Sequence, residues 1–419
     1  MSASPLRPTQ QHALRRISEL LGSDDAGVVS QGCELLQSLD DRALLTWLLA
    51  GSKIDPNGYL NAGTRLRERV QRAHRHQVLL TLMDLDGVER LNFERLRDPR
   101  LLERLVELPA LRSLRVSIAD AVDLRFVEHL PRLESLSLES MKRAPDLTPL
   151  RLATALRIFS ARRMRLRDLS ALRDVQTLEW LILNINPIDD VSPLADLPRL
   201  ETLDLGQNEA LTDVSPLARA PALQRLSLSA CAALRDFSPL AEMHALRALD
   251  LSDNLALEDL SPLARLHNLR SLELYRCEGL EDLSPLAGLS QLRALDLTDN
   301  IELINADAVE GMTGLVSLCL RECEALARIP RLDQLKRLET LDLNSTQGFT
   351  DFAALTTLPV LRALDLGAIH VEPWPDLSPL AEISTLQNLT LSHTPIDDLT
   401  PIAGLTGLHT LELDGCRNV

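Results

Sequence analysis

The side chains that could do chemistry in this chain are carboxylates that recur at a regular spacing. From Asp250 to Glu273 and on to Asp296 the spacing is 23 residues, and each carboxylate lies between two leucines. This alternation predicts short strands with one buried face, so the acids would point outward in a row on strands about 5 Å apart. Neighbours in such a row repel weakly. One carboxylate per strand lacks the convergent oxygens that calcium requires, so we expect neither a metal site nor a cofactor.

Cys319 is an outward-facing residue that could act as a nucleophile. Its segment holds no histidine, and His393 and His409 follow two or three segments later, a distance that discourages a catalytic dyad. Cys323 is expected to point inward, so the two thiols do not form a metal-binding pair. The chain has no Ser-His-Asp spacing, no phosphate-binding loop and no Cys-x-x-Cys motif. We therefore predict a protein without catalytic activity. The alternative for this residue is a thiol-dependent enzyme that is delivered as an effector, which we consider less favoured than the two functions given at the end of this section.

Aromatic residues make up only 3% of the chain, so those that face outward are informative. Trp and Tyr beside Arg are the usual anchors of protein interfaces. The predicted protein-binding residues are Trp180, Ile182, Ile185, Tyr275 and Arg276, together with the acidic residues Asp204, Asp250, Glu273, Asp296, Asp342 and Asp365. The alternative is that these charges and apolar groups only keep a long sheet soluble.

The element that must position these residues is a unit of 23 residues, well seen from Leu246 to Leu269. Its first leucines alternate with polar residues, Asn254 follows, and Ser261-Pro262 opens a second short element, with Ser as the expected N-cap and Pro at the first helical position. A unit this short cannot close a core alone and must stack on copies of itself. Fifteen units open at Val88, Leu111, Leu133, Leu156, Leu178, Leu200, Leu223, Leu246, Leu269, Leu292, Leu315, Leu338, Leu361, Leu386 and Leu408.

The tails of the units share one motif. It reads DVSPLA at 190–195 and 213–218, DFSPLA at 236–241, DLSPLA at 259–264, 282–287 and 376–381, and DLTPIA at 398–403. Over about four fifths of its length the chain resembles the leucine-rich repeat family, and the motif is similar to the bacterial, internalin-like class of short repeats. The resemblance implies an α/β fold, a right-handed solenoid with a parallel sheet on its concave face and short helical segments on its convex face.

The resemblance also implies a ladder of side chains that bond to backbone groups in the turn after each strand. The ladder position holds Asn186, Asn208, Asn254 and Asn300, interleaved with Cys231, Cys277, Cys323 and Cys416. Cysteine is a small buried group that donates weakly, so it can replace asparagine there.

The first part of the chain lacks the repeat and is expected to be helical. We predict helices over residues 10–21, 24–39 and 41–49, a loop over 52–58, and a fourth helix that starts after Thr64 and continues through 78–83. Residues 1–85 would therefore form an all-α N-terminal capping region, and residues 86–419 the leucine-rich repeat solenoid, with repeats of 22–25 residues. The arginine-rich run 65–76 has no interleaved aromatic residue, which disfavours binding to nucleic acid.

Charge and composition narrow the partners further. The net charge is −16, with 28 Lys+Arg and 23 Asp+Glu in residues 1–177 against 16 and 37 in residues 178–419. We expect an unidentified protein partner, no nucleic acid and no membrane, since no segment approaches the roughly 18 to 20 apolar residues of a membrane span. Six cysteines, four of them in repeat register, favour a reduced, cytoplasmic location.

Two functions fit these expectations. The first is a protein–protein interaction module that presents a curved concave sheet to its partner. The second is a self-associating structural or scaffold protein. The chain stops six residues after Leu413, so the last repeat is expected to be uncapped, and it could stack on the basic first part of another copy.

Overall fold

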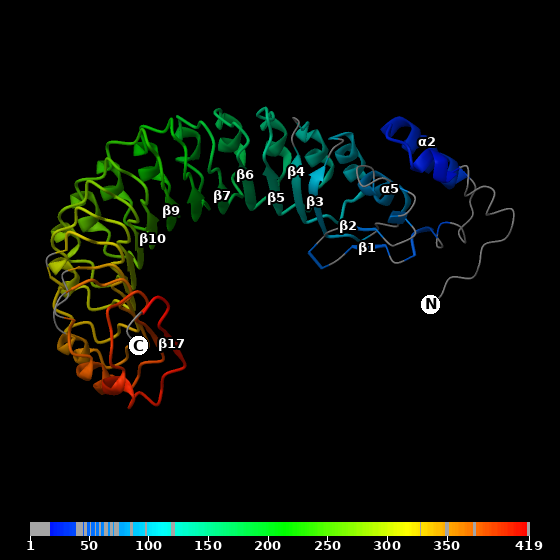
Figure 1. Ribbon diagram of the computed structural model, residues 1–419. Helices are drawn as coiled ribbons and strands as arrows, with labels where there is room; N and C mark the ends of the chain where they lie inside the picture. The colour runs from blue at the N-terminus through cyan, green and yellow to red at the C-terminus, as the bar shows by residue number, and fades with distance from the viewer. Residues whose placement is uncertain are drawn as a thin grey trace. The chain divides into compact units, whose positions relative to one another are not determined.

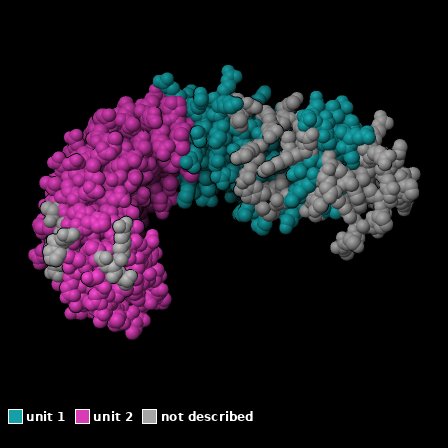
Figure 2. All heavy atoms as spheres, in the orientation of Figure 1, with its two compact units in different colours: residues 1–181 teal, residues 182–419 magenta. Residues whose placement is uncertain are grey.

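The computed structural model describes residues 17–38, 45, 48–50, 52–54, 56–57, 60–62, 66–67, 70, 75–83, 87–96, 99–118, 122–326, 328–347, 352–371 and 374–416. The chain divides into two compact units, Met1–Leu181 (unit 1) and Ile182–Val419 (unit 2), which are coloured separately in Figure 2. The predicted division between residues 85 and 86 is a different one and stays a prediction.

Helices occupy the N-terminal part of unit 1, as the sequence predicts. α2 (Ala26–Ser38) packs against α5 (Arg75–Leu82), and α2 buries Val29, Cys33 and Leu36 at the helical spacing of three and four residues. α2 confirms the helix predicted over 24–39. The helices predicted over 10–21 and 41–49 lie largely outside the described residues.

Two expectations for this part of the chain are confirmed only in part. The segment 52–58, predicted as a loop, has a turn at Pro56 and Asn57, but it also contains β1 (Lys53–Ile54), which pairs antiparallel with β2 (Leu60–Asn61). Strands of two residues are too short to produce an alternating pattern, so the sequence does not reveal them.

The fourth helix is confirmed in part. Leu66 and Arg67 are helical, as expected for a helix that starts after Thr64, but Val70 is a bend and α5 begins at Arg75, so the helix is not continuous. The guanidinium of Arg75 donates to the carbonyl oxygens of Val70 at 3.2 Å and of Arg67 at 3.1 Å, and Arg67 Nε donates to Ala62 O at 2.6 Å. These side chains take carbonyl groups that a continuous helix would bond with its own amides.

The repeats form a parallel sheet in which fifteen strands follow the order of the chain. Its first strands are β3 (Arg90–Leu96), β4 (Ser113–Ile118), β5 (Ser135–Glu139), β6 (Ile158–Arg162) and β7 (Trp180–Ile182). The strands of unit 2 are β8 (Thr202–Asp204), β9 (Arg225–Ser227), β10 (Ala248–Asp250), β11 (Ser271–Glu273), β12 (Ala294–Asp296), β13 (Ser317–Cys319), β14 (Thr340–Asp342), β15 (Ala363–Asp365), β16 (Asn388–Thr390) and β17 (Thr410–Glu412). Equivalent residues lie opposite each other, as Leu249 does to Leu272.

Short 3-10 helices lie on the face opposite the strands, as each unit shows in Figure 1. In unit 1 they are η1 (Pro99–Glu107), η2 (Leu124–His129), η3 (Thr148–Leu152) and η4 (Ser170–Asp174). In unit 2 they are η5 (Ser192–Leu194), η6 (Ser215–Arg219), η7 (Ser238–Glu242), η8 (Ser261–Arg265), η9 (Ser284–Leu286), η10 (Asp307–Gly311), η11 (Ala353–Thr357), η12 (Ser378–Glu382) and η13 (Thr400–Ile402). The interior between the two faces is filled mainly by leucines.

The expected capping role of Ser261 is wrong. Ser261 is the first residue of η8, and the preceding Leu260 makes no side-chain cap. Asp259 supplies the acceptor instead: its Oδ1 receives the N–H of Ser261 at 2.8 Å, and its Oδ2 receives the serine hydroxyl at 2.7 Å. The same carboxylate-to-serine contact recurs at Asp282 and Ser284. The aspartate of the DLSPLA motif therefore begins the 3-10 turn.

The ladder of asparagines and cysteines is confirmed. Asn254 is 2% exposed, and its Nδ2 donates to Leu251 O at 2.7 Å in its own repeat and to Leu228 O at 3.0 Å in the preceding one. Cys277 Sγ donates to Leu251 O at 3.4 Å and more weakly to Tyr275 O at 3.9 Å, so cysteine keeps the bond to the preceding repeat. The side chains of Asn208, Asn254 and Asn300 and of Cys231, Cys277 and Cys323 thus bond to the preceding coil.

The residue before each ladder position adopts a left-handed backbone. In unit 2 the non-glycine residues at this position are Ile185, Gln207, Ala230, Asp253, Arg276, Asp299, Glu322, Ser345, Ala368 and His393, with φ between 50° and 60°, and Gly415 has a φ of 73°. This conformation turns the main-chain N–H toward the next coil, as Asp253 N donates to Tyr275 O at 2.7 Å. The strain is therefore balanced by a hydrogen bond between repeats.

Candidate functional site

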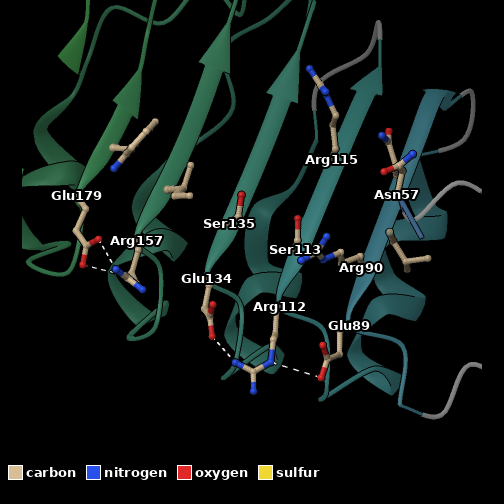
Figure 3. Close-up of a pocket in the computed structure, with 14 residues that line it drawn as sticks. Asn57, Glu89, Arg90, Arg112, Ser113, Arg115, Glu134, Ser135, Arg157 and Glu179 are labelled. Carbon is tan, nitrogen blue, oxygen red and sulfur yellow. Dashed lines mark hydrogen bonds and ion pairs between the residues drawn. The ribbon is translucent and has the colours of Figure 1, made fainter. Parts of the chain in front are cut away.

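The strand face of unit 1 is hollowed into an open groove across β3 to β7 (Figure 3). The groove has a volume of about 790 Å³. Its middle is lined by the small side chains of Ser113 and Ser135, and Asn57 from the N-terminal segment also lines it. The long side chains that surround the serines are charged or apolar, and these decide what the groove can bind.

Charged residues of alternating sign run along one edge of the groove. This alternating row consists of Glu89, Arg112, Glu134, Arg157 and Glu179. Each of these residues directly precedes a strand. Arg112 lies between two acids, with Nε 3.6 Å from Glu89 Oε1 and Nη1 paired to Glu134. Arg157 binds Glu179 through two bonds of 2.8 and 2.6 Å (Figure 3). Opposite charges on neighbouring strands hold these side chains in place.

The groove also offers exposed apolar surface and the cation of Arg90. Trp180 is 43% exposed and Ile158 is 38% exposed, and both line the groove. Arg90 is exposed and forms no ion pair with any residue that the structure describes. An aromatic ring, an aliphatic side chain and a guanidinium that lacks a carboxylate are the groups that a protein partner can contact.

Of the predicted binding residues, Trp180 belongs to unit 1 and the others to unit 2. Ile182 and Ile185 are half-buried, and Ile185 has the left-handed φ of 59°, which is unusual for a β-branched residue. Ile158 was missed from the sequence, and Arg90 was expected to face outward but was not among the predicted binding residues. Each occupies the strand-start position that also holds Trp180.

Most acids of the predicted row are half-buried and already hold main-chain amides. Asp250 Oδ1 accepts the N–H of Ser252 at 3.0 Å, and its Oδ2 accepts the hydroxyl of Ser227 at 2.8 Å. The same bond to the N–H two residues on occurs at Asp204, Asp296, Asp342 and Asp365. These aspartates shape the turn after the strand, which is a structural role beside any contact with a partner.

Glu273 differs from the aspartates of the row. It is exposed, and the strand register places it between Asp250 and Asp296. Partial burial raises the pKa of the Glu273 carboxyl above its ordinary value, and the negative charges of Asp250 and Asp296 add to that shift. Burial likewise raises the pKa of Asp342, with a further contribution from Asp365. Neighbouring carboxylates of the row therefore repel one another.

Tyr275 and Arg276 follow Glu273 at the end of β11. The guanidinium carbon of Arg276 lies 5.7 Å from the centroid of the Tyr275 ring, and Arg276 Nη2 pairs with Asp253 Oδ1 at 2.5 Å. Tyr275 is half-buried. The structure thus brings together Asp250, Glu273, Asp296, Tyr275 and Arg276 on three adjacent strands of unit 2.

Other residues considered from the sequence have environments that argue against chemistry. Burial raises the pKa of the Cys319 thiol to about 12, so it stays protonated near neutral pH, whereas a nucleophile needs the thiolate. Within the described ranges, no group of three or more His, Cys, Asp or Glu side chains is arranged to hold a metal ion. The described helices include none with the length and hydropathy of a membrane span. The cytoplasmic location stays a prediction.

The fold and these sites define a leucine-rich repeat solenoid. The family model for leucine-rich repeats in two copies matches residues 176–219. The chain is a leucine-rich repeat protein with N-terminal helices, and its repeats are of the bacterial, internalin-like class. Folds of this class are typically protein-binding modules and usually non-catalytic.

Two solved structures illustrate the similarity. An internalin from Listeria monocytogenes shares 27% identity at a TM-score of 0.62, over 75% of this chain and 88% of that chain. A leucine-rich repeat protein from Leptospira interrogans shares 22% identity at a TM-score of 0.62, over 74% of this chain and 80% of that chain, which shows the fold alone. No curated protein matches the chain.

Proposed function

We propose that this protein binds a protein partner on its strand face, without catalysis, and that the groove of unit 1 anchors the contact. The observation that carries the proposal is the exposure of Trp180 and Ile158 in a groove whose charged edge is held by ion pairs. A rigid, preformed surface lowers the ordering cost of binding. Arg90 supplies a cation for a partner carboxylate.

The second contact in this proposal lies in unit 2, at the predicted residues Glu273, Tyr275 and Arg276. Tyr275 and Arg276 present a stacked aromatic ring and guanidinium, and Glu273 is an exposed carboxylate on the same strand. The aspartates of the row support this contact by position, although their turn bonds occupy one oxygen each.

The test is the recovery of co-purified proteins on the tagged full chain from its native cells, measured by quantitative mass spectrometry. Trp180→Ala with Ile158→Ala should reduce recovery of the specific partner by about tenfold or more, since buried interface anchors contribute about 2 kcal/mol each. The matched control is Leu152→Ala, which removes a side chain that is 60% exposed on η3, on the opposite face. Unchanged recovery with the double variant contradicts the proposal.

Self-association is the second candidate function. Leu411 of β17 is 38% exposed, whereas Leu389, its register partner in β16, is fully buried. β17 is the last strand in the sheet order, and an edge strand with an exposed leucine can pair with another chain. Light scattering at micromolar concentration and low salt tests this candidate, and a monomer under those conditions contradicts it.

A further inference from the structure

Three arginines of unit 2 lie side by side at the starts of neighbouring strands, and none of them forms an ion pair with a residue that the structure describes. Arg247, Arg270 and Arg293 are exposed, and each precedes its strand, β10, β11 or β12, by one residue. The main-chain N–H of Arg270 donates to Arg247 O at 2.7 Å, and that of Arg293 donates to Arg270 O at 2.8 Å. We call these three residues the arginine row.

Other arginines at the same position are paired. Arg112 and Arg157 of unit 1 belong to the alternating row, and Arg362 lies 3.5 Å from Glu339 of the neighbouring strand. The arginine row has no such partner: none of its members forms an ion pair with any described residue, and the positions that flank it are Gln224 and Val316.

Like charges on neighbouring strands destabilise a sheet, so the arginine row has an energetic cost that the alternating row lacks. The residues that follow it, Ala248, Ser271 and Ala294, are small and lie opposite one another in register. Their short side chains leave little bulk on the sheet next to the arginine row. The arginine row is therefore accessible to a ligand that lies across the strands.

We propose that the arginine row binds an acidic helix of the partner protein, with carboxylates spaced three and four residues apart. Adjacent strands are about 4.8 Å apart, and helix residues three or four apart are separated by about 5–6 Å at Cβ, so successive carboxylates match successive arginines. Each guanidinium can take a carboxylate through two parallel bonds. This proposal rests on the proposed protein-binding function and specifies the chemistry of the partner.

A nucleic acid fits the arginine row less well. Asp250, Glu273 and Asp296 lie three residues after the arginines on the same strands. A polyanion crossing this face would bring its phosphates close to those carboxylates, and only three cations would oppose them. A short acidic face of limited length avoids that repulsion.

The test uses the full chain and two synthetic peptides of identical composition. One peptide places its glutamates three and four residues apart on one helix face, and the other distributes them around the helix. Fluorescence anisotropy at low salt should give at least about tenfold tighter binding for the one-face peptide, and Arg270→Glu should weaken that binding by about tenfold. Arg362→Gln, which alters a paired arginine at the same position, should leave it unchanged.

Three results would overturn the proposal. These are equal affinity for both peptides, affinity that Arg270→Glu leaves intact, and tighter binding of a single-stranded DNA oligonucleotide that is lost in Arg270→Glu. Thermal unfolding by circular dichroism verifies that the variant is folded. Because the recovery experiment alters Trp180 and Ile158 in unit 1, the proposed function can hold even if the peptides do not bind.

Discussion

The main-chain N–H of Arg270 donates to the carbonyl oxygen of Arg247, so two like-charged side chains leave adjacent strands from equivalent positions. In unit 1 the same main-chain bond joins Glu134 to Arg112, and there the side chains attract. The same main-chain hydrogen bond thus joins two side chains that repel in unit 2 and two that attract in unit 1. A comparison of the two sites therefore separates the effect of the side-chain charges on stability from that of the backbone.

Replacing Arg270 by Glu should stabilise the protein, because it converts the arginine row into an alternating row. We expect the free energy of unfolding to rise by about 0.5 kcal/mol, the scale of cross-strand charge pairs. Urea unfolding monitored by circular dichroism measures it. Arg362→Glu is the control, and it should lower the free energy of unfolding, because it replaces the cation next to Glu339 by a second acid. Shifts of equal sign in the two variants would contradict this account.

The ladder predicts a graded response at Asn254. Asn254→Ala removes donors to Leu228 O and Leu251 O inside the protein and should lower the free energy of unfolding by about 2 kcal/mol. Asn254→Cys should cost less, because Cys277 keeps one such bond at its own position. Asn268→Ala is the control: Asn268 is exposed and should change stability by no more than about 0.5 kcal/mol. Equal losses for Ala and Cys would argue against the ladder as the cause.

Glu273 should make stability depend on pH in a defined direction. Its pKa in the folded protein is raised above the ordinary 4.5, so folding favours the protonated form. That contribution is complete below pH 4.5 and is lost as pH rises through the folded pKa. Glu273→Gln should therefore melt at a higher temperature than the unaltered protein at pH 7, and the difference should vanish toward pH 4. Calorimetry across this range measures it.

Asp259→Asn provides the matched comparison with Glu273→Gln. The side-chain and main-chain bonds from Ser261 lower the pKa of Asp259, so its contribution to stability is present above the unfolded pKa and is lost in acid. The asparagine variant should accordingly melt below the unaltered protein at pH 7. If both variants shift the melting temperature upward, the assigned causes are wrong.

The buried thiols predict a loss of stability in alkali. Burial raises the pKa of Cys231 to about 11 and those of Cys277 and Cys323 to about 12, from an ordinary 9.0. Their stabilising contribution is complete below pH 9 and is lost as pH rises through 11 and 12. The melting temperature should fall steeply over this interval. The triple Cys→Thr variant should fall less, because threonine already holds the ladder bond at Thr346 and does not titrate there.

The repeat architecture could be predicted because leucine spacing alone determines which side chains face the interior. The ladder followed from the same register, and Trp180 was found because outward aromatic residues are rare. The groove of unit 1 was missed because it depends on which long side chains border small ones across several strands. Ile158 was missed because an isoleucine in a strand has the same pattern whether it is buried or exposed. The roles of Asp259 and Asp250 as turn acceptors depend on hydrogen bonds that spacing does not reveal.

The arginine row and the alternating row were both present in the sequence as residues spaced by 22 or 23 positions. Aligning the units on the residue before each strand would have shown acids and arginines alternating at Glu89, Arg112 and Glu134, and three arginines in succession later. Whether those charges pair could not be predicted, because pairing depends on side-chain conformation.

The equal register of β9 to β15, in which neighbouring strands from Leu226 to Leu364 pair leucine with leucine, makes the coils interchangeable. Removing one complete 23-residue coil, such as that of Leu272, would leave a ladder residue bonded to a leucine carbonyl at the new junction. Such a deletion would bring Arg247 next to Arg293 and shorten the arginine row by one residue. The length of the binding surface is thus an adjustable property of the chain, set by the number of coils and separable from the stability of each one.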